Sequence, residues 1–423
     1  MDVDSLIVRY DAPLNSEEGA QDEVMQALHD EIMKVTDDEA QAAMLLIAIS
    51  SALKGLDSAQ TSIGAGHLVA PESQTAAIIQ TTLAELAAEG AIDMGAATVA
   101  PSGANEIPFD HWDIVKWIGA VLVKLTSRKW PWSEGLSTAH NVGNQLRIAL
   151  VADWGTAMYG APKIAQTLGS QTFDIMMHLG DVYYSGTSIE VQDRFLKHWP
   201  KNQNTMHRAL NSNHEMYSGG EGYFHLTLPA FVQEASYFAL QNDHWVLAAL
   251  DTGYEDHDLA GGQEAWLTNV IAAAGARRVL LFSHHQPFSA LESQGKKLTA
   301  RLASLLAARK VYAWYWGHEH RAVVYDEHPI WRMHGRCLGH GGMPYKTLSK
   351  YNAANSQYSQ NGSKWVRVPG EGGVPGSMIL NDSNPFIGND YGPNGYMTLE
   401  LDGPNLTERF HNPDGTSVYE RTF

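Results

Sequence analysis

The pattern of apolar and polar positions changes near residue 145. Before that point apolar residues recur three and four positions apart, which is the period of an amphipathic helix. Thr36-Asp37-Asp38-Glu39 fits a capping box at the start of one such segment. Helices of this kind bury one another's apolar stripes, so the pattern predicts a small helical bundle domain over residues 1–140. Segments with this spacing are Val24 to Ile32, Met44 to Leu53, Ile78 to Leu86 and Trp112 to Leu122.

After residue 145 short apolar runs alternate with helical stretches. The runs predict buried strands at Ile148 to Ala152, Ile175 to Leu179, Trp245 to Leu250, Val279 to Phe282 and Val311 to Trp316. The stretches predict helices at Ala161 to Leu168, Gln263 to Ala274 and Leu298 to Ala308. This alternation predicts an α/β layered catalytic domain over residues 141–345, with its chemistry where strands end in loops.

The last 75 residues have a different pattern, with Gly, Asn and Pro turns followed by alternating segments. Tyr396 to Leu401 and Ser417 to Thr422 read as strands, and Asp414-Gly415 is a natural hairpin turn. We therefore expect residues 346–423 to be a β-rich extension that completes the catalytic domain.

The net charge of -18 limits the partners of the chain. Non-specific binding to nucleic acid or to an anionic membrane requires Lys and Arg, so neither is expected. A small phosphorylated substrate remains compatible if metal ions supply positive charge locally. The helices before residue 140 could serve a protein partner or self-association, although no motif supports either role.

Three features favour a cytoplasmic location. The N-terminus lacks the basic and apolar regions of a secretory signal. The longest apolar run, Ala42 to Leu53, is too short to span a bilayer. Cys337 is the only cysteine, so no intrachain disulfide can form.

Metal-ligand residue types follow one strand after another. Each group alone is weak evidence, because an Asp at a strand end is often a helix cap and an isolated His is usually structural. Five groups in succession are harder to explain in that way, since burying so many polar side chains unpaired would cost several kcal/mol. Carboxylate, imidazole and amide oxygen suit Fe, Mn and Zn. The groups are Ala152-Asp153-Trp154-Gly155, Gly180-Asp181-Val182-Tyr183-Tyr184, Asn213-His214-Glu215, Ser283-His284-His285-Gln286-Pro287 and Gly317-His318-Glu319-His320.

The order of these groups resembles the calcineurin-like metallophosphoesterase superfamily and, within it, the purple acid phosphatases. The resemblance covers residues 153–320. It implies a four-layer α/β/β/α sandwich of two mixed sheets, with a dinuclear metal centre that hydrolyses phosphoric esters by metal-activated water or hydroxide. Asp181 would bridge the two ions. Asp153, Tyr184 and His320 would complete the first site, and Asn213, His284 and His318 the second.

Position 155 is Gly where many relatives have His, which makes Tyr184 the natural replacement ligand. Phenolate ligation needs a strongly acidic ion, so the resemblance implies iron at the first site and Fe, Zn or Mn at the second. The alternative is that Tyr184 packs over two divalent ions. Ser212 replaces the usual Gly before Asn213. Either His284 or His285 could be the ligand, and His284 is favoured because it directly follows the strand.

The remaining polar residues receive catalytic or supporting roles. His214 is expected to contact the phosphate and protonate the leaving oxygen, with a supporting hydrogen bond as the alternative. Glu215 could orient His214 or a ligand. His285 and His340 are candidates for lining the phosphate pocket.

The expected activity is that of a phosphomonoesterase of the acid phosphatase kind. A phosphodiesterase acting on cyclic nucleotides or other small diesters shares the same metal core and is the first alternative. A non-catalytic scaffold or binding protein stabilised by its metals is an alternative from a different class. The natural substrate, the metals bound in cells and the oligomeric state are not encoded in any motif.

Overall fold

The computed structural model describes residues 139–423, apart from residues 184, 203, 255–258, 260, 293, 346, 349–356, 387 and 390. The helical bundle expected over residues 1–140 lies outside the described residues, except for its last two positions. Apart from residues 217–219, the described residues belong to one compact unit. None of the helices described is both long and apolar enough to cross a membrane.

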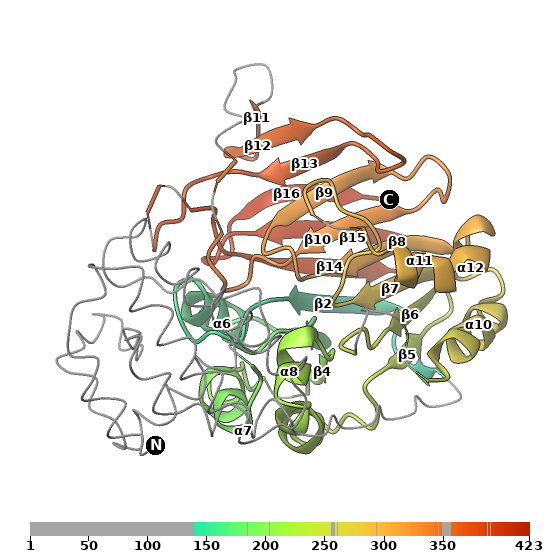
Figure 1. The fold of residues 1–423 in the computed structure, drawn as a ribbon, viewed down its shortest axis with the longest axis horizontal. Helices are drawn as coiled ribbons and strands as arrows, with labels where there is room; N and C mark the ends of the chain where they lie inside the picture. Colours follow the sequence, from blue (N-terminus) through green and yellow to red (C-terminus); the bar gives the residue numbers. More distant parts are fainter. Residues whose placement is uncertain are drawn as a thin grey trace, which may run out of the picture. The chain divides into compact units, whose positions relative to one another are not determined.

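Two mixed sheets form the centre of this unit (Figure 1). The ten-stranded sheet has the order β1-β5-β6-β7-β8-β10-β9-β13-β12-β11, and the six-stranded sheet has the order β16-β15-β14-β2-β3-β4. The strands of the first are β1 (His140–Asn141), β5 (Phe238–Gln241), β6 (Trp245–Ala249), β7 (Arg278–Ser283), β8 (Val311–Trp316), β9 (Ala322–Glu327), β10 (His334–Leu338), β11 (Gln357–Gln360), β12 (Ser363–Val368) and β13 (Ser377–Leu380). Those of the second are β2 (Gln145–Val151), β3 (Ile175–His178), β4 (Met206–Ala209), β14 (Tyr396–Asp402), β15 (Asn405–His411) and β16 (Ser417–Thr422).

Helices cover the outer face of each sheet. On the ten-stranded sheet, the apolar side chains of α10, α11 and α12 belong to one buried cluster with those of β6, β7 and β8. On the six-stranded sheet, α6 and the π-helical turn η1 pack on β2 and β3. The result is the expected four-layer α/β/β/α sandwich. The helices are α6 (Ala161–Gly169), α7 (Ser188–Glu190), η1 (Val191–Leu196), α8 (Asn213–Tyr217), η2 (Tyr223–Thr227), α9 (Leu228–Ala230), α10 (Gln263–Ala274), α11 (Lys296–Arg301) and α12 (Ala303–Ala307).

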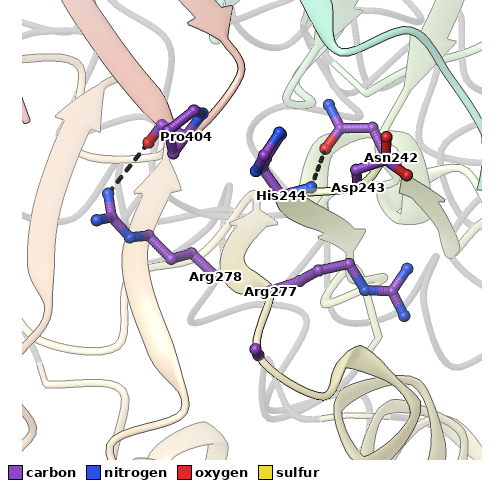
Figure 2. A pocket seen from close by; sticks show the side chains of 7 residues that line it. Asn242, Asp243, His244, Arg277, Arg278 and Pro404 are labelled. Carbon is purple, nitrogen blue, oxygen red and sulfur yellow. Dashed lines mark hydrogen bonds between the residues drawn. The ribbon is translucent and has the colours of Figure 1, made fainter.

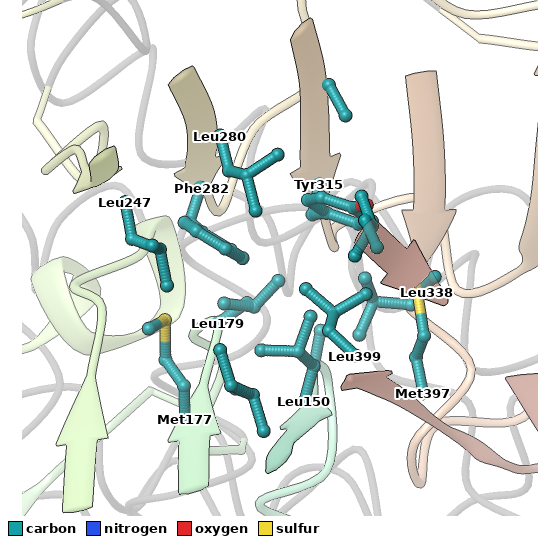
Figure 3. Close-up of a cluster of buried hydrophobic side chains, with 14 of the residues drawn as sticks. Leu150, Met177, Leu179, Leu247, Leu280, Phe282, Tyr315, Leu338, Met397 and Leu399 are labelled. Atoms are coloured by element: carbon teal, nitrogen blue, oxygen red, sulfur yellow. The ribbon is translucent and has the colours of Figure 1, made fainter. Parts of the chain in front are cut away.

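The main apolar core lies between the two sheets (Figure 3). Leu150 and Met177 from the six-stranded sheet meet Leu280 and Phe282 from the ten-stranded one, and all four are fully buried. Burying a side chain of this size stabilises the fold by roughly 1.5–3 kcal/mol. This core fixes the two sheets face to face, so the loops at their edges are held at defined positions.

The strands and helices predicted between residues 148 and 316 are all present, with one difference. The predicted helix at Leu298 to Ala308 is divided at Leu302 into α11 and α12. In the C-terminal part, both predicted strands form, and β15 lies between them in sequence and in the sheet. In β15, the buried positions alternate along the strand and are Leu406, Glu408 and Phe410. Because the middle position is a glutamate, a search for alternating apolar residues does not detect this strand.

The carboxyl ends of parallel strands from both sheets point to one side of the sandwich. In the six-stranded sheet β2, β3 and β4 are parallel neighbours. In the ten-stranded sheet β6, β7 and β8 are parallel neighbours. The loops that follow these strands carry the polar groups singled out in the sequence, as expected for α/β sheets.

Candidate metal centre

Asp153 and Asp181 lie just after β2 and β3, two adjacent parallel strands. Both carboxylates are fully buried. Both residues also have positive φ, 56° for Asp153 and 77° for Asp181, as do His318 at 69° and His320 at 48°. Non-glycine residues held in this strained region cluster at functional sites, where the surrounding structure imposes the conformation.

Two glycines leave room for these side chains. A Cβ on Gly317 would come within 2.6 Å of Oδ2 of Asp153, and a Cβ on Gly180 would come within 2.8 Å of Nδ1 of His284. Each distance is too short for any real contact, so both positions must be glycine. Gly180 also has a φ of 101°. The absence of a side chain at Gly180 and Gly317 therefore makes room for the side chains of His284 and Asp153.

The hydroxyl of Tyr183 lies at the meeting point of three candidate ligands. It is 2.8 Å from Oδ2 of Asp181, 3.1 Å from Oδ1 of Asp153 and 2.9 Å from Nε2 of His320. The tyrosine side chain is fully buried. Burial, followed by the two carboxylates, holds the pKa of the Tyr183 phenol well above its usual value.

Histidines surround the carboxylate of Asp181 on its remaining sides. Nε2 of His284 is 3.1 Å from Oδ1 of Asp181, and Nε2 of His214 is 3.8 Å from its Oδ2. The ring of His318 lies 5.2 Å from the ring of His284, centroid to centroid. Burial alone would raise the pKa of Asp181, but the charges of His214, His284 and His318 outweigh it and lower that pKa.

His284 and His285 both face the site, each fixed by a different hydrogen bond. Nδ1 of His284 lies 2.9 Å from the carbonyl oxygen of Leu179, and Nδ1 of His285 lies 2.9 Å from Oγ1 of Thr252. One ring nitrogen held in this way is the usual arrangement around a ligating histidine. Of these two histidines, His284 is the one that contacts the Asp181 carboxylate among the contacts described.

Ser212 and Glu215 form a buried group beside Asp181. Oγ of Ser212 lies 2.5 Å from Oδ1 of Asp181 and also hydrogen bonds with Oε2 of Glu215. The backbone amide of Asp181 donates to Oε2 of Glu215 at 3.2 Å. Burial, and then the charge of Asp181, raises the pKa of Glu215 to about 8. Glu215 thus contacts Asp181 rather than the ring of His214.

The other predicted residues lie as follows. Asn213 begins α8 and is buried. Tyr184 lies outside the described residues. His340 is fully buried, with Nδ1 3.2 Å from the carbonyl oxygen of Leu338 and its ring 5.8 Å from that of Phe410. The contacts described place His340 against β15 rather than beside the Asp181 carboxylate.

Sequence reasoning assigned no role to Tyr183 and treated Ser212 only as a small departure. Tyr183 was passed over because the spacing of the family motif selects the next residue. Apart from that spacing, no sequence signal distinguishes these two adjacent tyrosines. A serine directly before an expected ligand is a signal for a hydrogen bond to a neighbouring carboxylate, and here that bond forms.

The donor set suits a metal ion. The side-chain donor atoms of Asp153, Asp181 and His284 lie within 4.8 Å of one another, and so do those of His284, His285 and His318. Burial, and then the charge of Asp181, raises the pKa of Asp153 well above its usual value. Two buried carboxylates that share one hydroxyl need a counter-charge, and a multivalent cation bound between them would supply it.

A separate polar pocket lies at the opposite edge of the ten-stranded sheet, near the amino ends of β6 and β7 (Figure 2). Its volume is about 600 Å³, and its lining includes His244, Arg277 and Arg278. Arg278 donates to the carbonyl oxygen of Pro404 at 3.3 Å. None of the candidate ligands lines this pocket, so it is not part of the metal centre.

Residues 146–322 match the calcineurin-like phosphoesterase family. Among solved structures, the chain is similar to a purple acid phosphatase, PPD1, from seeds of yellow lupin (Lupinus luteus), with 15% identity and a TM-score of 0.48. That match covers 69% of this chain and 55% of the lupin protein. A search of curated proteins found no match.

Two further structures are similar over 66% of this chain. GAP50, described as the anchor in the inner membrane complex of Plasmodium, has 15% identity and a TM-score of 0.45, with 88% of it covered. A dimetal phosphatase from Danio rerio has 13% identity and a TM-score of 0.40, with 98% of it covered. The family match, which ends two residues after His320, identifies residues 146–322 as a calcineurin-like phosphoesterase domain.

Proposed function

We propose that this chain is a phosphomonoesterase that works at a dinuclear metal centre. The observation that carries the proposal is the gathering of Asp153, Asp181 and His320 around one buried hydroxyl, with His284 against the other carboxylate oxygen of Asp181. By resemblance, Asp153, Asp181, Tyr184 and His320 would hold one ion, and Asp181, Asn213, His284 and His318 the other. The preference for monoesters rests on the similarity of these motifs to purple acid phosphatases.

The chemistry that two cations supply at such a site is activation of water and neutralisation of the charge on phosphoryl oxygens. The protein's own groups hold and orient what binds there. Asp181 lies between the two ligand groups and is kept ionised by the histidines around it. Its carboxylate position is fixed by Ser212 on one oxygen and by the Tyr183 hydroxyl on the other.

His214 is the residue that we propose moves a proton. Its Nε2 is 3.8 Å from Oδ2 of Asp181, and its ring lies 4.5 Å from the ring of Tyr183. It is a buried residue of α8, which also carries Asn213, so its position relative to the centre is set by the helix. From there its ring can donate a proton to the oxygen that leaves phosphorus.

The test compares hydrolysis of p-nitrophenyl phosphate, bis(p-nitrophenyl) phosphate and single-stranded DNA by the metal-loaded full-length protein. We expect the monoester to be cleaved fastest and DNA not at all. Asp181→Asn should abolish turnover and reduce the metal content, whereas His214→Asn should lower kcat by about 10²- to 10⁴-fold and leave the metal content unchanged. Asp193→Asn, on an exposed part of η1, is the control and should behave as wild type.

Each other outcome has a definite meaning. Faster cleavage of the diester would replace the monoesterase proposal by a small-molecule phosphodiesterase. Cleavage of DNA would overturn the expectation that nucleic acid is not a substrate. A protein that binds two ions per chain and hydrolyses none of the three would favour a scaffold stabilised by metals.

A further inference from the structure

Glu319 stands between two candidate ligands, His318 and His320, in a turn with a strained backbone. Both histidines have positive φ, at 69° and 48°. A residue with a side chain adopts this conformation only when the surrounding structure holds it there. Glu319 itself is buried, with 2% of its surface exposed. Because a buried carboxylate costs free energy unless it is well paired, its presence at this point needs a reason.

Both oxygens of the Glu319 carboxylate accept hydrogen bonds from buried side chains. Nε1 of Trp316 donates to Oε1 at 2.8 Å, and Oγ of Ser289 donates to Oε2. Trp316 is the last residue of β8 and is fully buried. Ser289 is also buried and lies in the loop after β7, the strand next to β8 in the sheet. Glu319 therefore ties the turn after β8 both to its own strand and to the loop of the neighbouring strand.

The two partners of Glu319 are held in place by contacts of their own. Oγ of Ser289 accepts a hydrogen bond from the backbone amide of Leu291 at 3.0 Å. The ring of Trp316 lies 5.4 Å from that of Phe288, the residue before Ser289. The two donors are thus fixed by packing and by backbone, and the position of the Glu319 carboxylate follows from theirs.

The two loops that Glu319 connects carry three of the candidate metal ligands. His284 directly follows β7, and His318 and His320 flank Glu319 itself. The ring of His318 lies 5.2 Å from that of His284, so the two loops meet at ligands assigned to the same ion. Contacts that hold these loops together therefore also set the separation of the two rings.

We propose that Glu319 is a positioning residue of the metal centre, whose hydrogen bonds to Ser289 and Trp316 hold His318 and His320 in the orientation that binds metal. The inference rests on the proposed dinuclear centre. Glu319 acts through the two histidines and touches neither the ions nor the substrate. Groups that orient metal ligands in this way change metal affinity by about 10- to 100-fold when they are removed.

The test is the dissociation constant of the full-length protein for Zn(II), measured by competition with a chelating dye, together with the number of ions bound per chain. Glu319→Gln keeps the size of the side chain but has one acceptor oxygen instead of two, so the hydroxyl of Ser289 loses its acceptor. Ser289→Ala removes the same hydrogen bond from the other side. We expect each variant to bind Zn(II) about 10- to 100-fold more weakly than wild type. The double variant should bind no more weakly than the weaker single variant, because both changes remove one hydrogen bond.

Glu408→Gln is the matched control, since it changes another fully buried glutamate to glutamine. Among the contacts described, Glu408 binds Arg336 and Tyr315 and none of the candidate ligands. This variant should lower the urea midpoint of the metal-free protein and leave the dissociation constant for Zn(II) as in wild type. A purely structural role of Glu319 would give the same result for Glu319→Gln.

Three results would overturn the inference. Unchanged Zn(II) affinity in Glu319→Gln and Ser289→Ala would mean that the histidines are oriented without this carboxylate. Additive losses in the double variant would mean that the two residues do not act through one hydrogen bond. Equal weakening in Glu408→Gln would make the effect a general loss of stability.

Failure of the proposed function gives a different pattern. A wild-type protein that binds two ions and hydrolyses no phosphate ester would remove that function, while the affinities of the variants would still decide the role of Glu319. A wild-type protein that binds no metal would remove the proposed function and the inference together.

Discussion

The hydroxyl oxygen of Ser212 lies 2.5 Å from Oδ1 of Asp181, and the two residues come from different loops of the six-stranded sheet. The same oxygen accepts hydrogen bonds from the backbone amides of Asp181 and His214, each at 3.2 Å. One small side chain therefore links the loop after β3 to the start of α8. This link exists because a serine stands where relatives usually have glycine.

We expect Ser212→Ala and Ser212→Gly to weaken metal binding by about 10- to 100-fold, because hydrogen bonds that orient a ligating carboxylate contribute on this scale. The dissociation constant for Zn(II) or Mn(II), measured by competition with a chelating dye, checks this. The control is Ser170→Ala, which removes a hydroxyl that donates to the carbonyl oxygen of Thr167 at the end of α6. Unchanged affinity in both Ser212 variants would show that Asp181 is positioned without the serine.

Removal of metal should destabilise the protein, because Asp153 and Asp181 are then buried without their counter-charge. At a metal concentration 100 to 1,000 times the dissociation constant, bound metal contributes about 3–4 kcal/mol to the free energy of unfolding. We therefore expect a chelator to lower the Tm of wild type clearly. Asp153→Asn should respond much less, and Asp193→Asn should respond as wild type. Equal Tm values with and without chelator in wild type would contradict the expectation.

The buried ion pair of Arg336 and Glu408 connects the two sheets. Nη2 and Nε of Arg336, on β10, lie 2.6 and 2.7 Å from Oε1 of Glu408, on β15, and both side chains are fully buried. Removing one partner leaves the other charge buried alone. We expect Arg336→Met or Glu408→Gln to lower the free energy of unfolding by about 3–5 kcal/mol in urea titrations.

The double variant Arg336→Met with Glu408→Leu should lose less than the sum of the single changes, since neither charge then remains. The matched control is Asp326→Asn, which breaks an exposed pair with Arg367 and should cost about 1 kcal/mol or less. Additive losses in the double variant would mean that the two charges stabilise the protein independently.

His334 on β10 should make the protein acid-sensitive. Burial, and then the charges of Arg336, Arg421 and Arg332, lower the pKa of His334 from 6.5 to about 3. The folded state thus binds fewer protons than the unfolded state between these values. Stability is therefore present above pH 6.5 and falls as the pH drops toward 3.

At pH 5 the loss from His334 should be about 2 kcal/mol relative to pH 7, from 1.5 pH units at 1.36 kcal/mol each. We expect His334→Phe to show a smaller loss over the same range, because its ring can keep the contacts with Tyr312 and Phe423 without titrating. Urea unfolding at pH 7, 6 and 5 measures the difference. Parallel pH profiles for wild type and variant would assign the acid sensitivity to other groups.

The sequence alone was sufficient to predict helices and strands between residues 148 and 316. Buried strands such as Ile148 to Ala152 and helices such as Gln263 to Ala274 are encoded by short-range patterns, because period and capping act within a few residues. It was also sufficient to place the ligand types, since a polar residue directly after a buried strand must lie at the edge of the sheet. Hence the positions of Asp153, Asp181 and His284 followed from strand ends alone.

Only the tertiary structure decided which partners these elements take. Strand β14 pairs with β2 across about 250 residues of chain, with Leu399 opposite Ile148, and no local pattern specifies that register. The contacts of Tyr183 with Asp153 and His320, and the contact of Ser212 with Asp181, likewise depend on segments distant in sequence that pack together. The path of the loop after β3 depends on the close approach of Gly155 to the backbone of Asp181 and Val182. In the sequence, this approach is visible only as a glycine.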